Sequence, residues 1–494
     1  MYRSRITFAL AMAALAAILL PSPLPAQITF QRTYGGAADD EGNSVLQTND
    51  GGYIVAGYTS SSGAGGYDVY VVKTDSIGDE IWARTYGDAG SEGGFSVQQT
   101  YDSGYVIAGH TNSLGAGGND VYLIKTDAGG DVQWSKTYGG AADDGGCSVQ
   151  QTADSGYIIA GYTMSFGAGE GDIYLVKTDA NGDTQWTRTF GGSHADEGCA
   201  VEQSTDGGYI IAAGTTSFGS GNWDAYVIKA DANGDTLWTR TFGGPYKDEG
   251  YSVQQTSDGG FITTGATELD VGHVPDVYLV KTNADGDSLW TRAVESPDGA
   301  YGWSVRQTAD SGYVIAGTAY IPGRGDDLYL VRTNVAGDTL WTRTFGGDSS
   351  DYGWSVDRTG DGGLIVVGIT KSFGAGDGDV YLIKADSLGN VAVAEPKASP
   401  TRAPALSLFC EPNPATGTTT IHLTPFASRH SPLALRIYDA QGRAVRSFSS
   451  LLSPPSSLTW DGRDDRDQTL PSGAYFLRVD AGTEQASTRL VLQR

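Results

Sequence analysis

The sequence has few cysteines, few basic residues and almost no long apolar stretch. Only 3 of its 494 residues are Cys, too few for a disulfide framework. Lys and Arg total 32 against 58 Asp and Glu, so a nucleic-acid backbone would be repelled by the formal charge of −26. Beyond the N-terminus, no run approaches the roughly 20 apolar residues that cross a bilayer. These shortages exclude nucleic-acid binding and a transmembrane segment in the mature chain.

The N-terminus is the exception, because two arginines there precede an apolar run. Arg3 and Arg5 are followed by apolar residues 6–20 and then by Pro25-Ala26. This order is typical of a secretory signal peptide, and we predict one over residues 1–26 with cleavage after Ala26. The run is short for a span, which makes an uncleaved anchor the weaker alternative. The protein is expected to be secreted or to lie on the outer cell surface.

The abundant residue is glycine, with 71 copies, and it belongs to an internal repeat. Tryptophan returns every 52 residues, with one interval of 51, at Trp82, Trp134, Trp186, Trp238, Trp290 and Trp341. A D-[GS]-G step keeps the same period at Asp50, Asp102, Asp154, Asp206, Asp258, Asp310 and Asp361. We therefore predict seven copies, with one residue missing between Tyr313 and Asp327.

Each repeat contains four short runs rich in Val, Ile, Tyr, Thr and Trp. Over residues 251–294 these runs are YSVQQT, FITTGAT, DVYLVKT and SLWTRAV. The pattern is typical of β-strands joined by tight hairpin turns, and the longer stretch after the Trp run fits a crossing to the next sheet. Seven such sheets around a channel form a β-propeller. We therefore predict an all-β fold with a seven-bladed β-propeller over residues 27–394.

Two segments compete to close the ring. Residues 28–34 align with an outermost Trp strand and have no preceding strands, while the last repeat, residues 354–384, lacks a following one. The N-terminal segment is therefore expected to complete the last blade. The rival is residues 391–394, which follow the last turn and place Val393 in the Trp register.

The run D-A-N-G-D-T-x-W occurs at residues 179–186 and 231–238. It resembles the tryptophan-docking turn of quinoprotein-type propellers. The resemblance covers only the turn and the Trp strand of each repeat, and it implies that the outer-strand Trp packs on the next blade. Quinoprotein enzymes have eight blades and a calcium site, whereas this chain has seven repeats. The resemblance therefore supports the architecture and not a chemistry.

A second domain is predicted after the repeats. Residues 395–406 are rich in Pro, Ala and Ser, which is typical of a linker. Residues 407–494 alternate apolar residues with Gly, Asp and Pro turns, which predicts a small Ig-like β-sandwich.

Several motifs of this tail stand in a fixed order: Pro412-Asn413-Pro414, Ile437-Tyr438-Asp439, Gly442-Arg443, Trp460-Asp461-Gly462, Pro471-Ser472-Gly473 with Tyr475, and the terminal LVLQR. They resemble the C-terminal sorting domain of type IX secretion clients, which is related to the Ig-like fold of flagellar hook-capping proteins. The resemblance implies export across the outer membrane, with the secretion machinery as a partner. The ending is not the common Lys-rich one, so cleavage of the domain stays open. An ordinary accessory sandwich is the alternative.

Six of the seven repeats carry an acidic residue just before the inner strand. These residues are Asp40, Glu92, Asp144, Asp196, Asp248 and Asp351, and Ala300 is the exception. In equivalent blades the carboxylates would form a ring at one mouth of the channel. Such a ring could hold Ca²⁺, which takes oxygen ligands. The alternative, which we favour, is that the carboxylates accept backbone N–H groups in turns.

Three positions further on, the residue type varies from repeat to repeat. The residues are Asn43, Phe95, Cys147, Cys199, Tyr251, Trp303 and Trp354. Aromatic rings beside acceptors bind ligands, and Tyr251, Trp303 and Trp354 are the candidates, although such rings also fill gaps between blades. Cys147 and Cys199 are interpreted as small apolar fillers. No catalytic residue is predicted, because zinc-ligand spacing, a nucleophile elbow and a phosphate-binding loop are all absent from the sequence.

The predicted function is non-catalytic binding of a protein or glycan through the propeller loops. An extracellular hydrolase or lyase using acidic residues at the channel mouth is the alternative. An enzyme is expected to concentrate His, Arg or Glu in a few loops, and most loops here are nearly uniform. The loops at residues 268–275 and 320–326 depart most from the repeat.

Overall fold

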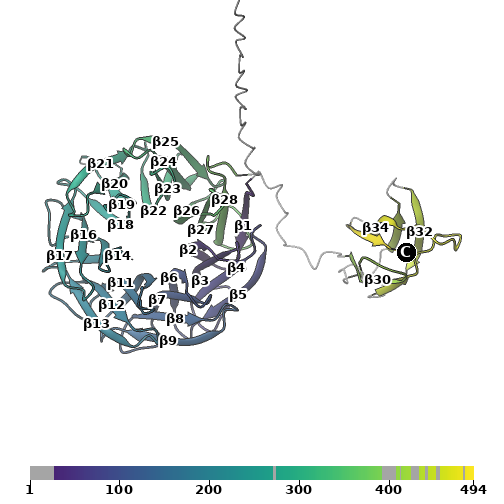
Figure 1. The fold of residues 1–494 in the computed structure, drawn as a ribbon, viewed down its shortest axis with the longest axis horizontal. Helices are drawn as coiled ribbons and strands as arrows, with labels where there is room; N and C mark the ends of the chain where they lie inside the picture. Colours follow the sequence, from purple (N-terminus) through teal and green to yellow (C-terminus); the bar gives the residue numbers. More distant parts are fainter. Residues whose placement is uncertain are drawn as a thin grey trace, which may run out of the picture. The chain divides into compact units, whose positions relative to one another are not determined.

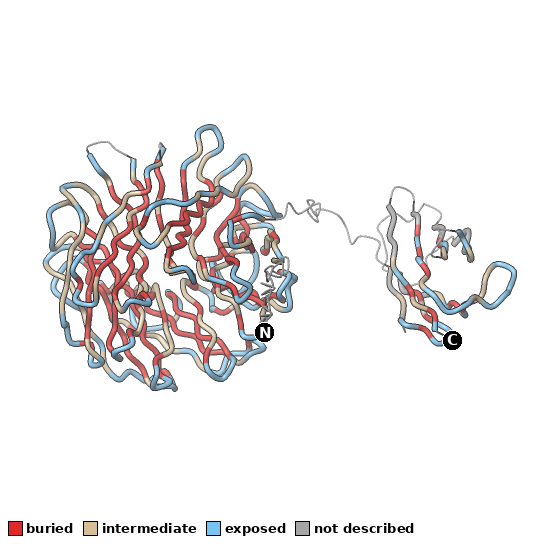
Figure 2. The backbone as a smooth tube through the Cα atoms, turned by 45° about the horizontal axis from the view of Figure 1, so that its top comes forward, coloured by how far each residue is buried: buried red, intermediate tan, exposed pale blue. Residues whose placement is uncertain are grey.

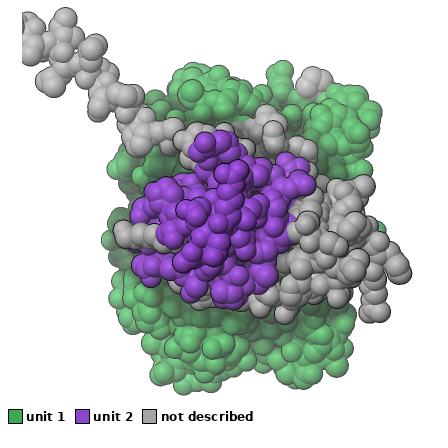
Figure 3. Space-filling view, turned by 90° about the vertical axis from the view of Figure 1, so that its right-hand side faces the viewer, with its two compact units in different colours: residues 1–395 green, residues 396–494 purple. Residues whose placement is uncertain are grey.

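The computed structural model describes residues 27–270, 274–296, 298–391, 408–411, 413–423, 433–439, 443–451, 457–481 and 484–493. The predicted signal peptide and linker lie outside these residues. The chain divides into two compact units, Met1–Glu395 and Pro396–Arg494, which Figure 3 distinguishes by colour. Every named element is a β-strand, as the all-β prediction requires. Within the described part of the chain, no helix has the length and apolarity to cross a membrane.

The first unit is a seven-bladed β-propeller, because seven four-stranded antiparallel sheets surround one centre (Figure 1). The inner strands are β2 (Asp40–Gln47), β6 (Glu92–Gln99), β10 (Asp144–Gln151), β14 (Asp196–Gln203), β18 (Asp248–Gln255), β22 (Ala300–Gln307) and β26 (Asp351–Arg358). The second strands are β3 (Tyr53–Thr59), β7 (Tyr105–Thr111), β11 (Tyr157–Thr163), β15 (Tyr209–Thr215), β19 (Phe261–Thr267), β23 (Tyr313–Ile321) and β27 (Leu364–Thr370).

The third and outer strands complete the blades. The third strands are β4 (Asp68–Thr74), β8 (Asp120–Thr126), β12 (Asp172–Thr178), β16 (Asp224–Ala230), β20 (Asp276–Thr282), β24 (Gly325–Thr333) and β28 (Asp379–Ala385). The outer strands are β5 (Glu80–Tyr86), β9 (Val132–Tyr138), β13 (Thr184–Phe190), β17 (Thr236–Phe242), β21 (Ser288–Val294), β25 (Thr339–Phe345) and, for the last blade, β1 (Phe30–Tyr34). We number the blades 1 to 7 from the inner strands β2 to β26.

The N-terminal closure is confirmed, because β1 pairs antiparallel with β28. The register runs from Phe30 opposite Lys384 to Tyr34 opposite Val380. Phe30 takes the place of the repeated Trp and packs edge-on against Tyr53 of blade 1, with ring centroids 5.8 Å apart. The one-residue deletion between Tyr313 and Asp327 lies in the hairpin of β23 and β24. These two strands are longer than their equivalents in other blades and pair as far as Ile321 opposite Gly325.

Each outer-strand Trp packs on the following blade, as the docking resemblance implied. Trp82 of blade 1 lies so close to the hairpin turn of blade 2 that a Cβ on Gly130 would be 2.9 Å from its ring. The same Trp meets Tyr105 edge-on at 6.0 Å. Tyr86 donates a hydrogen bond of 2.6 Å to the carbonyl of Gly130. Because Gly130 has φ +83°, the turn needs its glycine for conformation as well as for space.

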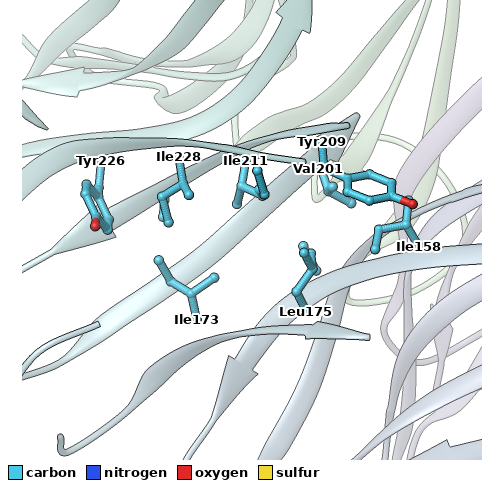
Figure 4. Close-up of a cluster of buried hydrophobic side chains, with 11 residues drawn as sticks. Ile158, Ile173, Leu175, Val201, Tyr209, Ile211, Tyr226 and Ile228 are labelled. Atoms are coloured by element: carbon cyan, nitrogen blue, oxygen red, sulfur yellow. The ribbon is translucent and has the colours of Figure 1, made fainter. Parts of the chain in front are cut away.

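The propeller core is a series of apolar layers between neighbouring blades. Figure 4 shows one such layer, where Ile173 and Leu175 of β12 face Ile211 of β15 and Ile228 of β16. The second and third strands are buried on both faces, while the outer strands alternate with exposed residues (Figure 2). This explains why the middle runs of each repeat are continuously apolar and the Trp runs are not.

The second unit is a β-sandwich of two sheets. One has the order β29 (Leu408–Glu411), β30 (Thr419–Leu423) and β33 (Ser457–Trp460). The other has the order β32 (Ala444–Leu451), β31 (Leu433–Tyr438), β34 (Gly473–Ala481) and β35 (Glu484–Leu492). Trp460 is 2% exposed and packs on Tyr475 at 5.9 Å. Asn413 donates to Arg489 O at 2.7 Å and accepts from Val491 N at 2.9 Å. Two of the tail motifs thus contribute to the core, and a third holds the last strand.

Candidate functional site

The six acidic residues that begin the inner strands are buried inside the loops of their own blades. None is more than 1% exposed. In blade 3, Asp144 Oδ2 accepts from Gly140 N and from Ser165 Oγ, both at 2.7 Å. In four other blades the equivalent serine hydroxyl donates a hydrogen bond to the equivalent acid: Ser61 to Asp40, Ser113 to Glu92, Ser217 to Asp196 and Ser372 to Asp351. These contacts agree with the favoured interpretation, in which the carboxylates accept backbone N–H groups in turns.

A second buried carboxylate accompanies each of these acids across the blade junction. At the junction of blades 2 and 3, a Cβ on Gly139 would lie 2.2 Å from Asp120 Oδ1 and 2.6 Å from Asp144 Oδ2. Because Gly139 has no Cβ at this point, the two carboxylates can approach each other across the junction. Among the described residues, no group of three or more His, Cys, Asp or Glu is arranged to hold a metal. Ligand binding by these acids stays a prediction, and it would require the loops to open.

The variable position of each inner strand is a β-bulge. In blades 5, 6 and 7 the ladder register shifts across Gly250/Ser252, Gly302/Ser304 and Gly353/Ser355. The extra residue in each case is the aromatic one, and a bulge redirects its side chain. Tyr251 stacks on Trp303 at 4.3 Å between ring centroids, and Trp303 meets Trp354 edge-on at 5.2 Å. The fold therefore brings together three residues that lie about 50 positions apart in the sequence.

Two further tyrosines extend this group. Tyr301 stacks on Trp303 at 5.6 Å, and Tyr352 stacks on Trp354 at 5.7 Å with the two ring planes 2° apart. We call Tyr251, Tyr301, Trp303, Tyr352 and Trp354 the axial aromatic cluster, because all lie on the inner strands β18, β22 and β26 around the centre of Figure 1. Neither tyrosine was predicted from the sequence as a site residue. The sequence feature that could have identified them is their position, two residues before the bulge residue of the same strand.

Glutamates flank the axial aromatic cluster on both sides. Glu249 of β18 accepts a hydrogen bond from the Tyr251 hydroxyl. It also forms an ion pair of 2.9 Å with Lys247. Glu41 of β2 accepts from the Tyr58 hydroxyl. Burial raises the pKa of Glu41, although the hydrogen bond from Tyr58 acts in the opposite direction. Trp303 Nε1 is buried and has no hydrogen-bond partner.

The remaining bulge positions carry a different chemistry. Asn43 donates to Gly94 O at 3.0 Å, and Phe95 packs against His110 at 5.4 Å. Burial raises the pKa of the Cys147 thiol to about 12, which fits a filler and not a reactive nucleophile. The Cys199 side chain lies outside the described part of the structure. Among the bulge side chains that are described, Trp and Tyr are confined to blades 5, 6 and 7.

The D-[GS]-G aspartates have a structural partner that the sequence analysis did not foresee. In blade 4, Asp206 forms an ion pair of 2.9 Å with Lys229, whose side chain is only 4% exposed. The other blades repeat this pair as Asp50–Lys73, Asp102–Lys125, Asp154–Lys177, Asp258–Lys281, Asp310–Arg332 and Asp361–Lys384. Burial alone would raise the pKa of Asp206, but hydrogen bonds from Lys229 and Ser204 lower it below its ordinary value of 3.8.

These pairs predict a loss of stability in acid. A carboxylate whose folded-state pKa is lowered stabilises the fold above its unfolded pKa and loses that contribution as the pH falls through the folded value. The free energy of unfolding should therefore decrease once the pH is lower than about 4. Asp206→Asn should cost about 2 kcal/mol at pH 7, because Lys229 stays buried without its partner. Urea unfolding from pH 7 to pH 2 measures both effects.

The control is Asp235→Asn, which removes an ion pair of 3.1 Å between two exposed side chains, Asp235 and Arg188. Its cost should stay below about 1 kcal/mol. Equal costs for the two variants would contradict a special role for the buried lysine.

Comparison with known proteins identifies the domain of the second unit. Residues 413–485 match the FlgD Ig-like domain. The chain is thus a seven-bladed β-propeller with a FlgD Ig-like domain at its C-terminus. It is 27% identical over 242 residues to the regulatory protein FlaEY of Caulobacter vibrioides, an alignment that covers 42% of this chain and 25% of FlaEY. The chain therefore spans about a quarter of that relative.

Solved structures give weak likenesses. PorZ, a surface component of the type IX secretion system of Porphyromonas gingivalis, has a TM-score of 0.42 and 13% identity over 93% of this chain and 60% of its own. A puromycin hydrolase has a TM-score of 0.45 and 12% identity over 79% of this chain and 60% of its own. One of these is a secretion component and the other a hydrolase, so similarity of this degree gives no guide to function.

Proposed function

We propose that this protein is an exported, non-catalytic propeller that binds a glycan at the axial aromatic cluster. The observation that supports it is a local break in the repeat symmetry. The turn acids, the buried lysines and the docking tryptophans recur around the ring, whereas the stacked aromatic side chains gather in three adjacent blades. A feature that the architecture does not require in every blade is the better candidate for a binding function.

The chemistry of the axial aromatic cluster suits a sugar. Aromatic rings present flat apolar surfaces on which the C–H faces of a sugar ring can pack. Glu249 and Glu41 supply carboxylate acceptors for hydroxyl groups on the two sides of the rings. Trp303 Nε1 is a buried donor that a ligand oxygen would satisfy. A protein ligand would use the same rings but has less need of paired carboxylates.

A hydrolase or lyase is the second candidate, and Glu41 is the observation that favours it. A carboxyl group whose pKa is raised by burial is what a general acid needs near neutral pH. We place this candidate second because the acids predicted for the task, such as Asp40 and Asp144, are held inside their loops.

A glycan array probed with the purified full-length protein tests the proposal. Trp303→Ala and Trp354→Ala should each weaken binding of the captured glycan by roughly 10- to 100-fold, because each removes a central aromatic contact. Tyr101→Ala is the control: Tyr101 is 71% exposed and lies in the turn after an inner strand, so its removal should change nothing. Undiminished binding in both Trp variants would contradict the site. Release of shorter sugars would favour the hydrolase.

The second unit is proposed to carry the protein to the cell surface or medium through a type IX secretion machinery. Its support is the ordered set of tail motifs and the match to the FlgD Ig-like domain. Trp460 and Tyr475, which belong to those motifs, lie in the sandwich core. We therefore expect the whole domain, and not a short peptide, to be the export signal.

A further inference from the structure

The loops that link the second and third strands carry a common plug in three blades. Each plug is a Ser-Phe pair: Ser165-Phe166, Ser217-Phe218 and Ser372-Phe373. The phenylalanine packs on a third-strand tyrosine, with ring centroids 5.8 Å apart for Tyr174, 5.5 Å for Tyr226 and 5.7 Å for Tyr381. The serine hydroxyl donates to the acid that begins the inner strand. The plug therefore supplies an aromatic ring and a hydrogen-bond donor.

Blade 5 lacks both parts of the plug. Its loop reads Glu268-Leu269-Asp270, so Leu269 stands where the serine is and Asp270 where the phenylalanine is. In blades 3 and 4, a Cβ on Gly140 or Gly192 would lie within 3.3 Å of the Phe ring. On the equivalent Gly244, the same Cβ would meet nothing within 4 Å. No described residue therefore fills, in blade 5, the space that the plug fills in blades 3 and 4.

A pocket of about 250 Å³ occupies this place. Its walls include Gly244, Tyr278, Leu269, Asp248 and Glu268. Tyr278 is the tyrosine on which the missing ring would pack, and Asp248 is the acid that the missing serine would serve. Asp248 still accepts from Gly244 N at 2.7 Å and from the Thr267 side chain, but it has no serine donor from its own loop.

Charge around the pocket favours a cation. Burial raises the pKa of Asp248, hydrogen bonds from Thr267 and Gly244 act in the opposite direction, and the neighbouring carboxylates of Asp224 and Glu268 raise the pKa further. Arg292 also lines the pocket, but its guanidinium lies over the Trp290 ring and pairs with Asp338 of the next blade at 3.7 Å. A positively charged donor would relieve the repulsion among the carboxylates.

We propose that this pocket binds an aromatic ring that bears an ammonium group, with the ring on Tyr278 and the ammonium at Asp248 and Glu268. Such a ligand supplies the two parts that the loop of blade 5 lacks. The chemistry is found in arylalkylamines and in the free N-terminus of a peptide that begins with Phe or Tyr. The site is separate from the axial aromatic cluster and does not depend on its function.

Phenethylamine is the probe, and its binding to the full-length protein is measured by calorimetry or ligand-observed NMR at pH 7. We expect one saturable site. Ethylamine, which lacks the ring, and 2-phenylethanol, which lacks the charge, should each bind roughly 10-fold more weakly. A Phe-Gly-amide peptide compared with its N-acetylated form separates the two sources: binding of the free peptide above that of phenethylamine assigns the site to a peptide N-terminus, and weaker binding assigns it to small amines.

The decisive variant rebuilds the plug. Leu269→Ser, Asp270→Phe and Val271→Gly together restore the Ser-Phe-Gly sequence of blades 3, 4 and 7, in which the glycine has φ of 98° to 106°. This variant should no longer bind phenethylamine. Glu268→Gln should weaken binding about 3-fold, and Glu170→Gln in the exposed loop of blade 3 should leave it unchanged. Absence of saturable binding, equal binding by the rebuilt protein, or, if that protein does not fold, an unaltered affinity in Glu268→Gln would each overturn the proposal.

Discussion

Deletion of residues 27–36 should lower the melting temperature of the propeller by about 10 °C or more. This segment contains β1, which supplies the fourth strand of blade 7. Phe30 is 4% exposed and Tyr34 8% exposed, and both belong to the apolar layer between blades 7 and 1. The loss of one buried aromatic side chain typically costs 3 to 5 kcal/mol, roughly, and the deletion removes two of them together with a β-ladder.

The deletion also opens the ring. Tyr34 donates a hydrogen bond of 2.6 Å to Gly78 O in blade 1, so β1 joins the last blade to the first. The Gln27 side chain donates a hydrogen bond to Asp361 O at 2.7 Å and accepts one from Ser387 N at 2.9 Å. Thermal unfolding followed by circular dichroism measures the loss. Arg32→Ala is the control, because its ion pair with Asp79 at 3.5 Å is partly exposed and should contribute little. An unchanged melting temperature after the deletion would mean that the ring closes by another segment.

Truncation of residues 396–494 should reduce the amount of protein outside the cell at least about 10-fold, in a bacterium with a type IX secretion machinery. This result follows from the proposed sorting role, in which the machinery recognises the C-terminal domain and the predicted signal peptide directs the chain only across the inner membrane. Immunoblots of medium, cell surface and periplasm measure the distribution. The truncated protein should accumulate in the periplasm.

Two point variants separate recognition of the folded domain from the presence of the segment. Trp460→Ala removes the largest buried side chain of the sandwich and should also block export. Phe476→Ala removes a ring that is 45% exposed on β34 and should not. Undiminished export of the truncated protein would contradict the sorting role and favour an accessory sandwich domain.

The repeat made the fold predictable. Trp82 and its equivalents, the D-[GS]-G steps and the short hairpin connectors define the number of blades, the strands of each blade and their order. Even the closure by β1 follows from the register, because residues 28–34 align with a Trp strand that has no blade of its own. Such features are local: hairpin geometry and apolar alternation act between neighbouring residues, and repetition multiplies the signal.

The candidate site was predicted only in part. Tyr251, Trp303 and Trp354 were recognised because they vary at one repeat position. Four further residues of the site were not predicted: Glu41, Glu249, Tyr301 and Tyr352. The sequence of one repeat does not indicate that their side chains contact those of the next inner strand. For the acids such as Asp144, the sequence allowed both a ring at the channel mouth and a role in turns, and the contacts of Asp144 are those of the favoured turn role.

The sequence by itself determined the seven blades, the signal for closure and the presence of a second sandwich, since these depend on period and local pattern. The tertiary structure alone decided which side chains meet. A bulge at Gly250/Ser252 turns Tyr251 toward Trp303, and a glycine such as Gly139 lets two carboxylates approach across a blade junction. The physical reason is that direction and distance between blades arise from ring closure, which joins residues about 50 positions apart and leaves no trace in any one repeat.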